Sequence, residues 1–157
     1  MKLFTLTSIL LFGVSSFAGG MISAGPVTLS PLISCLAKSI DVTHPSQINR
    51  AVIASEVGTE NFQVLVLMKN NEVIRYYPIM IHRKGSADSI VYKIARYGYS
   101  SSTQIGSVYV SKIFSGSGNS RILPSQYAAV GELAELSLFN CSLVANTNSD
   151  QPRSFGP

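Results

Sequence analysis

Positively charged and tyrosine side chains gather between residues 75 and 99 of this chain. Five basic residues stand there against one acid, Asp88, and five tyrosines lie among them. Arginine can bind a phosphate or carboxylate through two parallel hydrogen bonds, and tyrosine offers a flat apolar ring with a polar tip. If the strands that carry these residues are neighbours, their shared face could hold an anionic partner. The residues predicted for this face are Arg75, Tyr77, Arg83, Lys84, Lys93 and Arg96.

The same composition is also typical of the solvated outer side of a sheet, because tyrosine is favoured in strands for its fit alone. Both interpretations stay open at the level of sequence.

Other residues that could serve in catalysis or metal binding are scarce. His44 and His82 are the only histidines, and the two cysteines are expected to pair with each other. The chain therefore lacks a set of metal ligands at defined spacing. No Gly-x-Ser-x-Gly motif marks a hydrolase nucleophile. Glu132 and Glu135 are interpreted as solvated surface charges. We therefore predict no metal and no cofactor and favour a non-enzymatic protein, with a small hydrolase using either histidine as an alternative.

The amino-terminal residues have the pattern of an export signal. Lys2 is followed by an apolar run over residues 3–14, and small residues end at Ala18. This run is too short to span a bilayer and has the length of a signal-peptide core. The sequence predicts a signal peptide over residues 1–18, with cleavage after Ala24 as the alternative, and hence a periplasmic or extracellular bacterial protein. No later stretch indicates a transmembrane helix.

The chain has two cysteines, Cys35 and Cys141. In an oxidising compartment an even pair predicts a disulfide. One alternative is two free buried thiols. Another is lipid modification of Cys35, because residues 32–35 read Leu-Ile-Ser-Cys, as before the modified cysteine of a bacterial lipoprotein. That alternative would anchor the protein to a membrane and leave Cys141 unpaired.

The bulk composition describes one folded domain. The chain has 157 residues, of which 46% are apolar and 13% charged, which argues against disorder. The formal net charge of +4 is small for a dedicated nucleic-acid-binding protein.

The clearest structural element is a hairpin over residues 62–83. Two apolar runs flank a polar tip that contains Asn70 and Asn71, residues that tolerate the positive φ of a tight turn. Both sides of the first run are apolar, so this strand is expected to be covered on both faces. The second run loses its alternation near Pro78, which predicts a bulge or bend there.

Short strand patterns continue along the chain. Further strands are expected over residues 35–42, 51–57, 90–97, 105–114 and 133–144. A short helix that begins at Ser30 and Pro31 is the alternative to the first of these strands, and residues 121–130 fit a strand or a helical turn. In the last strand Phe139, Cys141 and Leu143 are expected to share a face. The predicted fold is all-β: a single small antiparallel β-barrel or sandwich of about seven or eight strands. It occupies residues 35–144, between a loose leader over 19–34 and a polar tail over 145–157.

These patterns predict an exported, non-enzymatic binding or inhibitory module that engages an anionic envelope partner through a basic, tyrosine-rich face. The expected partner is an anionic envelope polymer or another envelope protein, without specific nucleic-acid binding. The alternative is a structural envelope component that holds partners through an apolar sheet edge.

Overall fold

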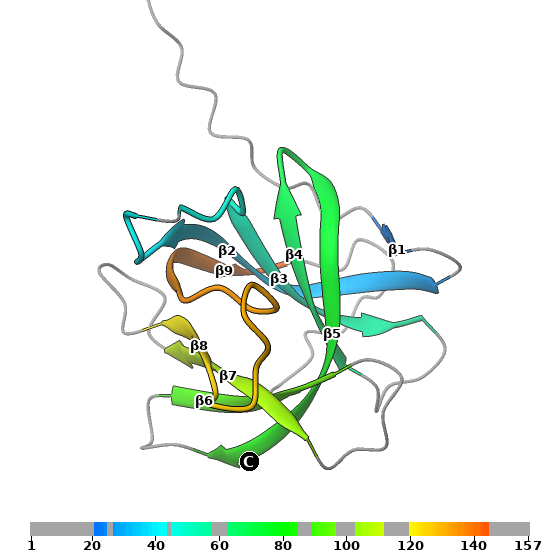
Figure 1. The fold of residues 1–157 in the computed structure, drawn as a ribbon. Helices are drawn as coiled ribbons and strands as arrows, with labels where there is room; N and C mark the ends of the chain where they lie inside the picture. Colours follow the sequence, from blue (N-terminus) through cyan, green and yellow to red (C-terminus); the bar gives the residue numbers. More distant parts are fainter. Residues whose placement is uncertain are drawn as a thin grey trace, which may run out of the picture.

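The computed structural model describes residues 21–24, 27–43, 45–57, 63–84, 89–96, 103–111 and 120–144. These residues form nine antiparallel strands, each paired with the next, and β2 also pairs with β9. Strands β2 to β9 therefore close into an eight-stranded barrel, with β1 as an extra strand beside β2 (Figure 1). The strands are β1 (Ile22–Ala24), β2 (Val27–Ser39), β3 (Arg50–Glu56), β4 (Gln63–Lys69), β5 (Glu72–Lys84), β6 (Ser89–Ala95), β7 (Gln104–Ser111), β8 (Arg121–Pro124) and β9 (Leu136–Leu143).

The all-β prediction is confirmed, and the closed pairing decides for a barrel over a sandwich. The expected signal over residues 1–18 and the polar tail over 145–157 lie outside the described residues.

The predicted hairpin is β4 and β5, and its turn is the one expected. Asn70 and Asn71 have φ of 49° and 69°. Positive φ at both central residues gives the turn the twist that matches its two strands. β4 is also covered on both faces, as predicted: Leu65 and Leu67 lie in the barrel core, while the opposite face belongs to a second apolar cluster. That cluster contains Ile22, Leu29, Val52, Ala54, Val64, Val66 and Met68.

The barrel closes where β2 meets β9, and the Cys35–Cys141 disulfide lies on this seam. The register shifts between Ser34 and Leu36, because Asn140 adopts a φ of 48° and forms a bulge in β9. An extra residue reverses the alternation of a strand. The expectation that Phe139, Cys141 and Leu143 share a face is therefore wrong. Cys141 instead joins Leu136 and Leu138 in the core.

Strand β2 begins at Val27, within residues that the sequence indicated as a loose leader, and β1 also lies there. Ile22 and Leu29 are buried in the second apolar cluster, which stabilises this early segment. β2 tolerates Pro31 because this edge of the strand has no partner there. Residues 27–29 pair with β1, and pairing with β9 starts only at Ile33. The proline nitrogen, which cannot donate, falls between the two ladders.

The bulge expected at Pro78 is not found. Pro78 pairs with Val64 in regular register, and β5 shifts register instead at Ile74 and at His82. The pairing of β5 with β6 begins only at Ile79, so the missing N–H of Pro78 interrupts no ladder on that side. Residues 121–130 begin as the short strand β8 and continue as turns.

Candidate functional site

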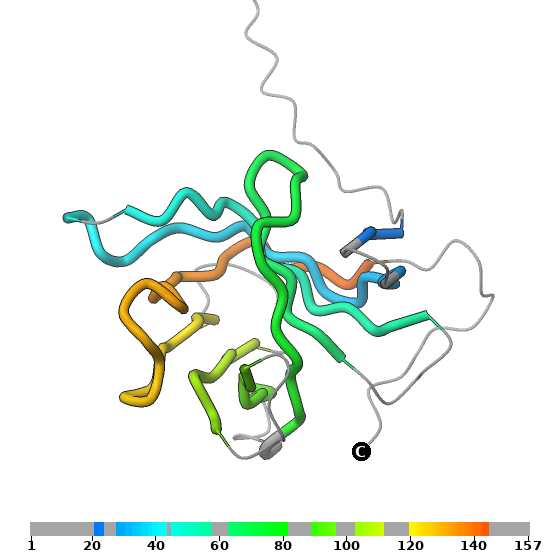
Figure 2. Tube along the Cα trace, turned by 45° about the vertical axis from the view of Figure 1, so that its right-hand side comes forward, coloured from blue at the N-terminus to red at the C-terminus, as the bar shows by residue number. Residues whose placement is uncertain are grey.

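The segment between β8 and β9, residues 125–135, is held on the barrel by side chains of β5, by Arg96 directly after β6 and by the backbone of β7. It lies at the same end of the barrel as the β2–β3 loop, away from β1 (Figure 2). The Arg75 guanidinium donates from Nη1 to the carbonyl oxygens of Gly131 and Glu132, at 2.8 and 2.7 Å. The Tyr77 hydroxyl donates to the same Glu132 carbonyl. Ser125 joins the segment to β7 by donating to the Gln104 carbonyl oxygen at 2.8 Å.

Glu132 is the centre of this arrangement. Arg96 donates to its two carboxylate oxygens from Nε at 2.6 Å and from Nη2 at 2.8 Å. The Ala129 N–H donates to the same carboxylate at 2.8 Å. The Arg96 hydrogen bonds, then that backbone bond and the charges of Arg96 and Arg75, lower the pKa of Glu132 to about 2. We call Arg75, Tyr77, Arg96 and Glu132 the Glu132 cluster.

The local sequence explains how the cluster forms. The register of β5 with β4 places Arg75 and Tyr77 on the side of the inward residues Leu67 and Leu65. Gly131 has a φ of 75°, which allows the turn closed by the Glu132 N–H on the Ala129 carbonyl. Leu133 then packs into the core at a position where Gly106 leaves room for it.

A second group of cations lies on the outside of the barrel. In the cross-strand register Tyr109 pairs with Arg121, and Arg121 pairs with Ser137. Ser137 in turn pairs with Lys38 on β2. The Arg121 guanidinium carbon lies 5.5 Å from the centre of the Tyr109 ring. On β6, Val91 is the cross-strand partner of Tyr109, and Lys93 lies two residues further along on the same outer side, opposite Ser107.

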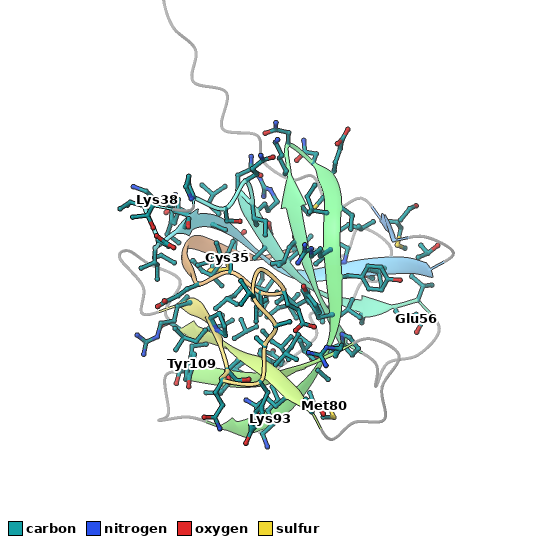
Figure 3. The ribbon with its side chains drawn as sticks, in the orientation of Figure 1. Cys35, Lys38, Glu56, Met80, Lys93 and Tyr109 are labelled. Carbon is teal, nitrogen blue, oxygen red and sulfur yellow. A yellow bond between two sulfur atoms is a disulfide. The ribbon has the colours of Figure 1, made fainter. Side chains whose placement is uncertain are left out.

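We call Lys38, Lys93, Tyr109 and Arg121 the outer basic face. Figure 3 shows three of these residues, Lys38, Tyr109 and Lys93, along the left and lower margin of the barrel. The five strands β2 and β6 to β9 contain no aspartate or glutamate. Within the described residues, no carboxylate pairs with Lys38, Lys93 or Arg121.

The six residues predicted for one binding face thus fall into separate groups. Arg75, Tyr77 and Arg96 come together, but around Glu132 and not on an open surface. Lys93 is on the outside of the barrel. Arg83 and Lys84 lie in β5 opposite Val91 and Ile90, and their side chains are outside the described residues. A binding role for these six residues stays a prediction.

The sequence interpretation missed three members of the outer basic face and misjudged Glu132. Lys38, Tyr109 and Arg121 lie far apart in the chain and meet only through barrel closure. Glu132 was expected to be a solvated charge, yet its side chain is only 16% exposed and is paired with Arg96. One feature of the sequence pointed to this pairing: basic residues outnumber acids between residues 75 and 96, so any carboxylate that pairs with Arg96 has to come from a distant segment.

Of the hydrolase candidates, His44 and the side chain of His82 lie outside the described residues. The part of the chain that the structure describes contains no cluster of three or more possible metal ligands among His, Cys, Asp and Glu. Within the same residues, no helix is long and apolar enough to cross a membrane. Comparison with known proteins gives no matching family, no matching curated protein and no matching solved structure.

Proposed function

We propose that this protein is an exported, non-enzymatic binding or inhibitory module whose outer basic face engages an anionic partner of the cell envelope. One observation carries the proposal: the five consecutive strands from β6 through β9 to β2 contain no acid and present Lys93, Arg121 and Lys38 in turn around half of the barrel wall. Cations gathered in this way raise the local concentration of an anionic polymer and speed its association.

The pair formed by Arg121 and Tyr109 supports recognition of a ring-containing anion. Stacking over the Tyr109 ring holds the Arg121 guanidinium in place while its N–H groups stay available to sulfate, phosphate or carboxylate. Lys93 adds a point charge on β6, the neighbour of β7, and Lys38 adds one on β2, beyond β9 on the other side of Arg121. The Glu132 cluster is not part of the proposed binding face. Its two arginines bind the β8–β9 segment and have a structural role.

The disulfide supports export, since such bonds persist in oxidising compartments. It also argues against the lipoprotein alternative. Lipid modification would make Cys35 the first residue, which would remove β1 and the part of β2 that pairs with it. The second apolar cluster would then lose Ile22 and Leu29 and expose the outer side of β3 and β4.

The test is retention of the folded protein on immobilised dextran sulfate and on neutral dextran in low salt. We expect retention on the sulfated polymer alone, and elution as salt screens the charges. The double variant Lys93→Gln/Arg121→Gln should elute at lower salt. Lys69→Gln is the control, because Lys69 lies on β4 and hydrogen bonds to Gln47, away from this face. Equal retention on both polymers, or equal elution of all three proteins, would contradict the proposal.

A further inference from the structure

The tip of the β8–β9 segment exposes apolar side chains on an uncharged stretch. Residues 126–131 read Gln-Tyr-Ala-Ala-Val-Gly. The Val130 side chain is fully exposed, with a relative accessibility of 108%, and Tyr127 is 64% exposed. The nearest carboxylate in the chain, Glu132, is paired with Arg96, and its side chain is only 16% exposed. An exposed apolar tip of this kind indicates a contact surface.

This tip is held rigidly in its exposed position. Arg75 and Tyr77 bind the backbone directly behind Val130, at Gly131 and Glu132. The Ser125 hydroxyl accepts from the Tyr127 N–H at 3.2 Å, and Leu133 fixes the far end in the core. Because the segment is already ordered, little conformational entropy is lost when the tip binds.

The tip lies near one member of the outer basic face, because Arg96, which donates to the Tyr127 carbonyl oxygen, follows Lys93 by three residues at the end of β6. Arg121 begins β8, whose end at Pro124 leads into the segment, and β9 leaves the segment toward Ser137, the partner of Lys38. Apolar and cationic groups thus lie at the same end of the barrel, with Val130 next to the residue that Arg75 of β5 binds and the cations on β6, β8 and β2. A soluble polyanion would use the cations but offers nothing that would bury Val130. A lipid surface with anionic head groups satisfies both, because it places acyl chains beneath its charges.

We infer that the envelope partner is an anionic lipid surface, into which Val130 and Tyr127 insert while the outer basic face binds the head groups. The inference rests on the proposed function and names its ligand class. Tyrosine suits the interface between head groups and acyl chains, because its ring lies in the apolar boundary and its hydroxyl in the hydrated head-group layer. Insertion is shallow, limited to one turn of chain around Val130.

The chain has no tryptophan, so a single introduced indole reports on one position. We would place it at Val130, by Val130→Trp, and, as the matched control, at Val57 by Val57→Trp. Val57 is 50% exposed and follows β3 at the opposite end of the barrel. Each protein is mixed with equimolar phosphatidylglycerol and phosphatidylcholine vesicles, with and without bromine on the acyl chains. We expect the bromine to quench the indole at position 130 and to leave the indole at position 57 bright.

A second pair of variants measures affinity. Val130→Asp should weaken vesicle binding roughly tenfold, the effect of losing one buried valine side chain, and Val57→Asp should leave it unchanged. Dextran sulfate binding should be the same for both variants. Vesicle binding without quenching at position 130, or no vesicle binding by a protein that retains dextran sulfate binding, would overturn the lipid inference alone. Loss of both kinds of binding in the unaltered protein would overturn the proposed function as well.

Discussion

Arg96 and Glu132 form a two-pronged ion pair across one end of the barrel, with N–O distances of 2.6 and 2.8 Å. Thirty-six positions separate them in sequence, and the pair links the end of β6 to the segment that joins β8 to β9. Together with Arg75 and Tyr77, it turns what would be an open loop into a fixed cover over the core. The rigidity of the exposed tip follows from this pair.

Removing the Glu132 charge should destabilise the protein. We expect Glu132→Gln to lower the free energy of unfolding by about 1–2 kcal/mol at neutral pH, after allowance for solvent screening of a partly exposed pair. Glu135→Gln should change it little, because Glu135 is exposed. Urea denaturation of the three proteins measures both values. Equal stability of Glu132→Gln and the unaltered protein would show that the pair does not stabilise the fold.

The same comparison has a defined pH dependence. The folded protein holds the Glu132 pKa at about 2, below its ordinary value of 4.5. A carboxyl with a lowered pKa contributes its stability above the ordinary value and loses it as pH falls toward the folded value. The difference between the two proteins should therefore be constant above about pH 5 and should become smaller as pH falls from 4.5 toward 2. A difference as large at pH 2 as at neutral pH would assign the effect to lost packing.

Gly106 makes room for the segment. A Cβ atom there would meet the Leu133 side chain and lie 2.7 Å from the Leu123 carbonyl oxygen, which is backbone and cannot move away alone. We expect Gly106→Ala to destabilise the protein by about 2–4 kcal/mol, as in other overpacked or displaced cores. Gly131→Ala is the contrast, since it meets no atom within 4 Å and costs only the strain of its φ of 75°. Thermal unfolding should rank Gly106→Ala as the less stable protein, and the reverse order would contradict this account.

Tyr92 has a fully buried hydroxyl with no hydrogen-bond partner among the described residues. Burial raises the pKa of Tyr92 to about 12. Replacing it by phenylalanine removes an unsatisfied polar group, so Tyr92→Phe should stabilise the protein by about 0.5–2 kcal/mol at neutral pH. The unaltered protein should lose stability as pH rises from 10 to 12, and this contribution should be missing in the variant. Lower stability of Tyr92→Phe would instead reveal a partner for the hydroxyl.

The disulfide spans 106 positions and joins β2 to β9, where the barrel closes. Reduction, or the double change Cys35→Ser/Cys141→Ser, should lower stability by about 2–5 kcal/mol, because the unfolded chain regains the entropy of a long loop. Chemical denaturation with and without reductant gives the value. Unchanged stability after complete reduction, checked by alkylation and mass, would mean that strand pairing alone holds the seam.

Much of the fold was predictable because its signals are local. The Asn70–Asn71 turn, the double coverage of β4 and the all-β class follow from residue types within a few positions of each other. The bulge at Asn140 was not predictable, because the apolar alternation of β9 does not show at which residue it reverses, and the positive φ of Asn140 is seen only in the structure. One extra residue there decides which side of β9 faces the core and brings Cys141 opposite β2.

The candidate site was less predictable, because it depends on contacts between distant segments. The basic stretch was recognised, but the sequence gives no indication that Arg75 and Arg96 are used to hold residues 127–132. The outer basic face appears only when β9 returns to β2 and places Lys38 beside the row that contains Arg121. Barrel closure, a long-range event, therefore decides which cations face a partner.

The most direct test of the proposed function is the salt dependence of dextran sulfate binding by the unaltered protein and by Lys93→Gln/Arg121→Gln. Each cation that contacts a polyanion releases condensed counterions, so the logarithm of affinity falls linearly with the logarithm of salt concentration. We expect the double variant to bind more weakly and its slope to be shallower by roughly one for each cation removed. If both proteins have the same affinity for dextran sulfate at every salt concentration, the binding site lies elsewhere on the molecule, and a role for the outer basic face is contradicted.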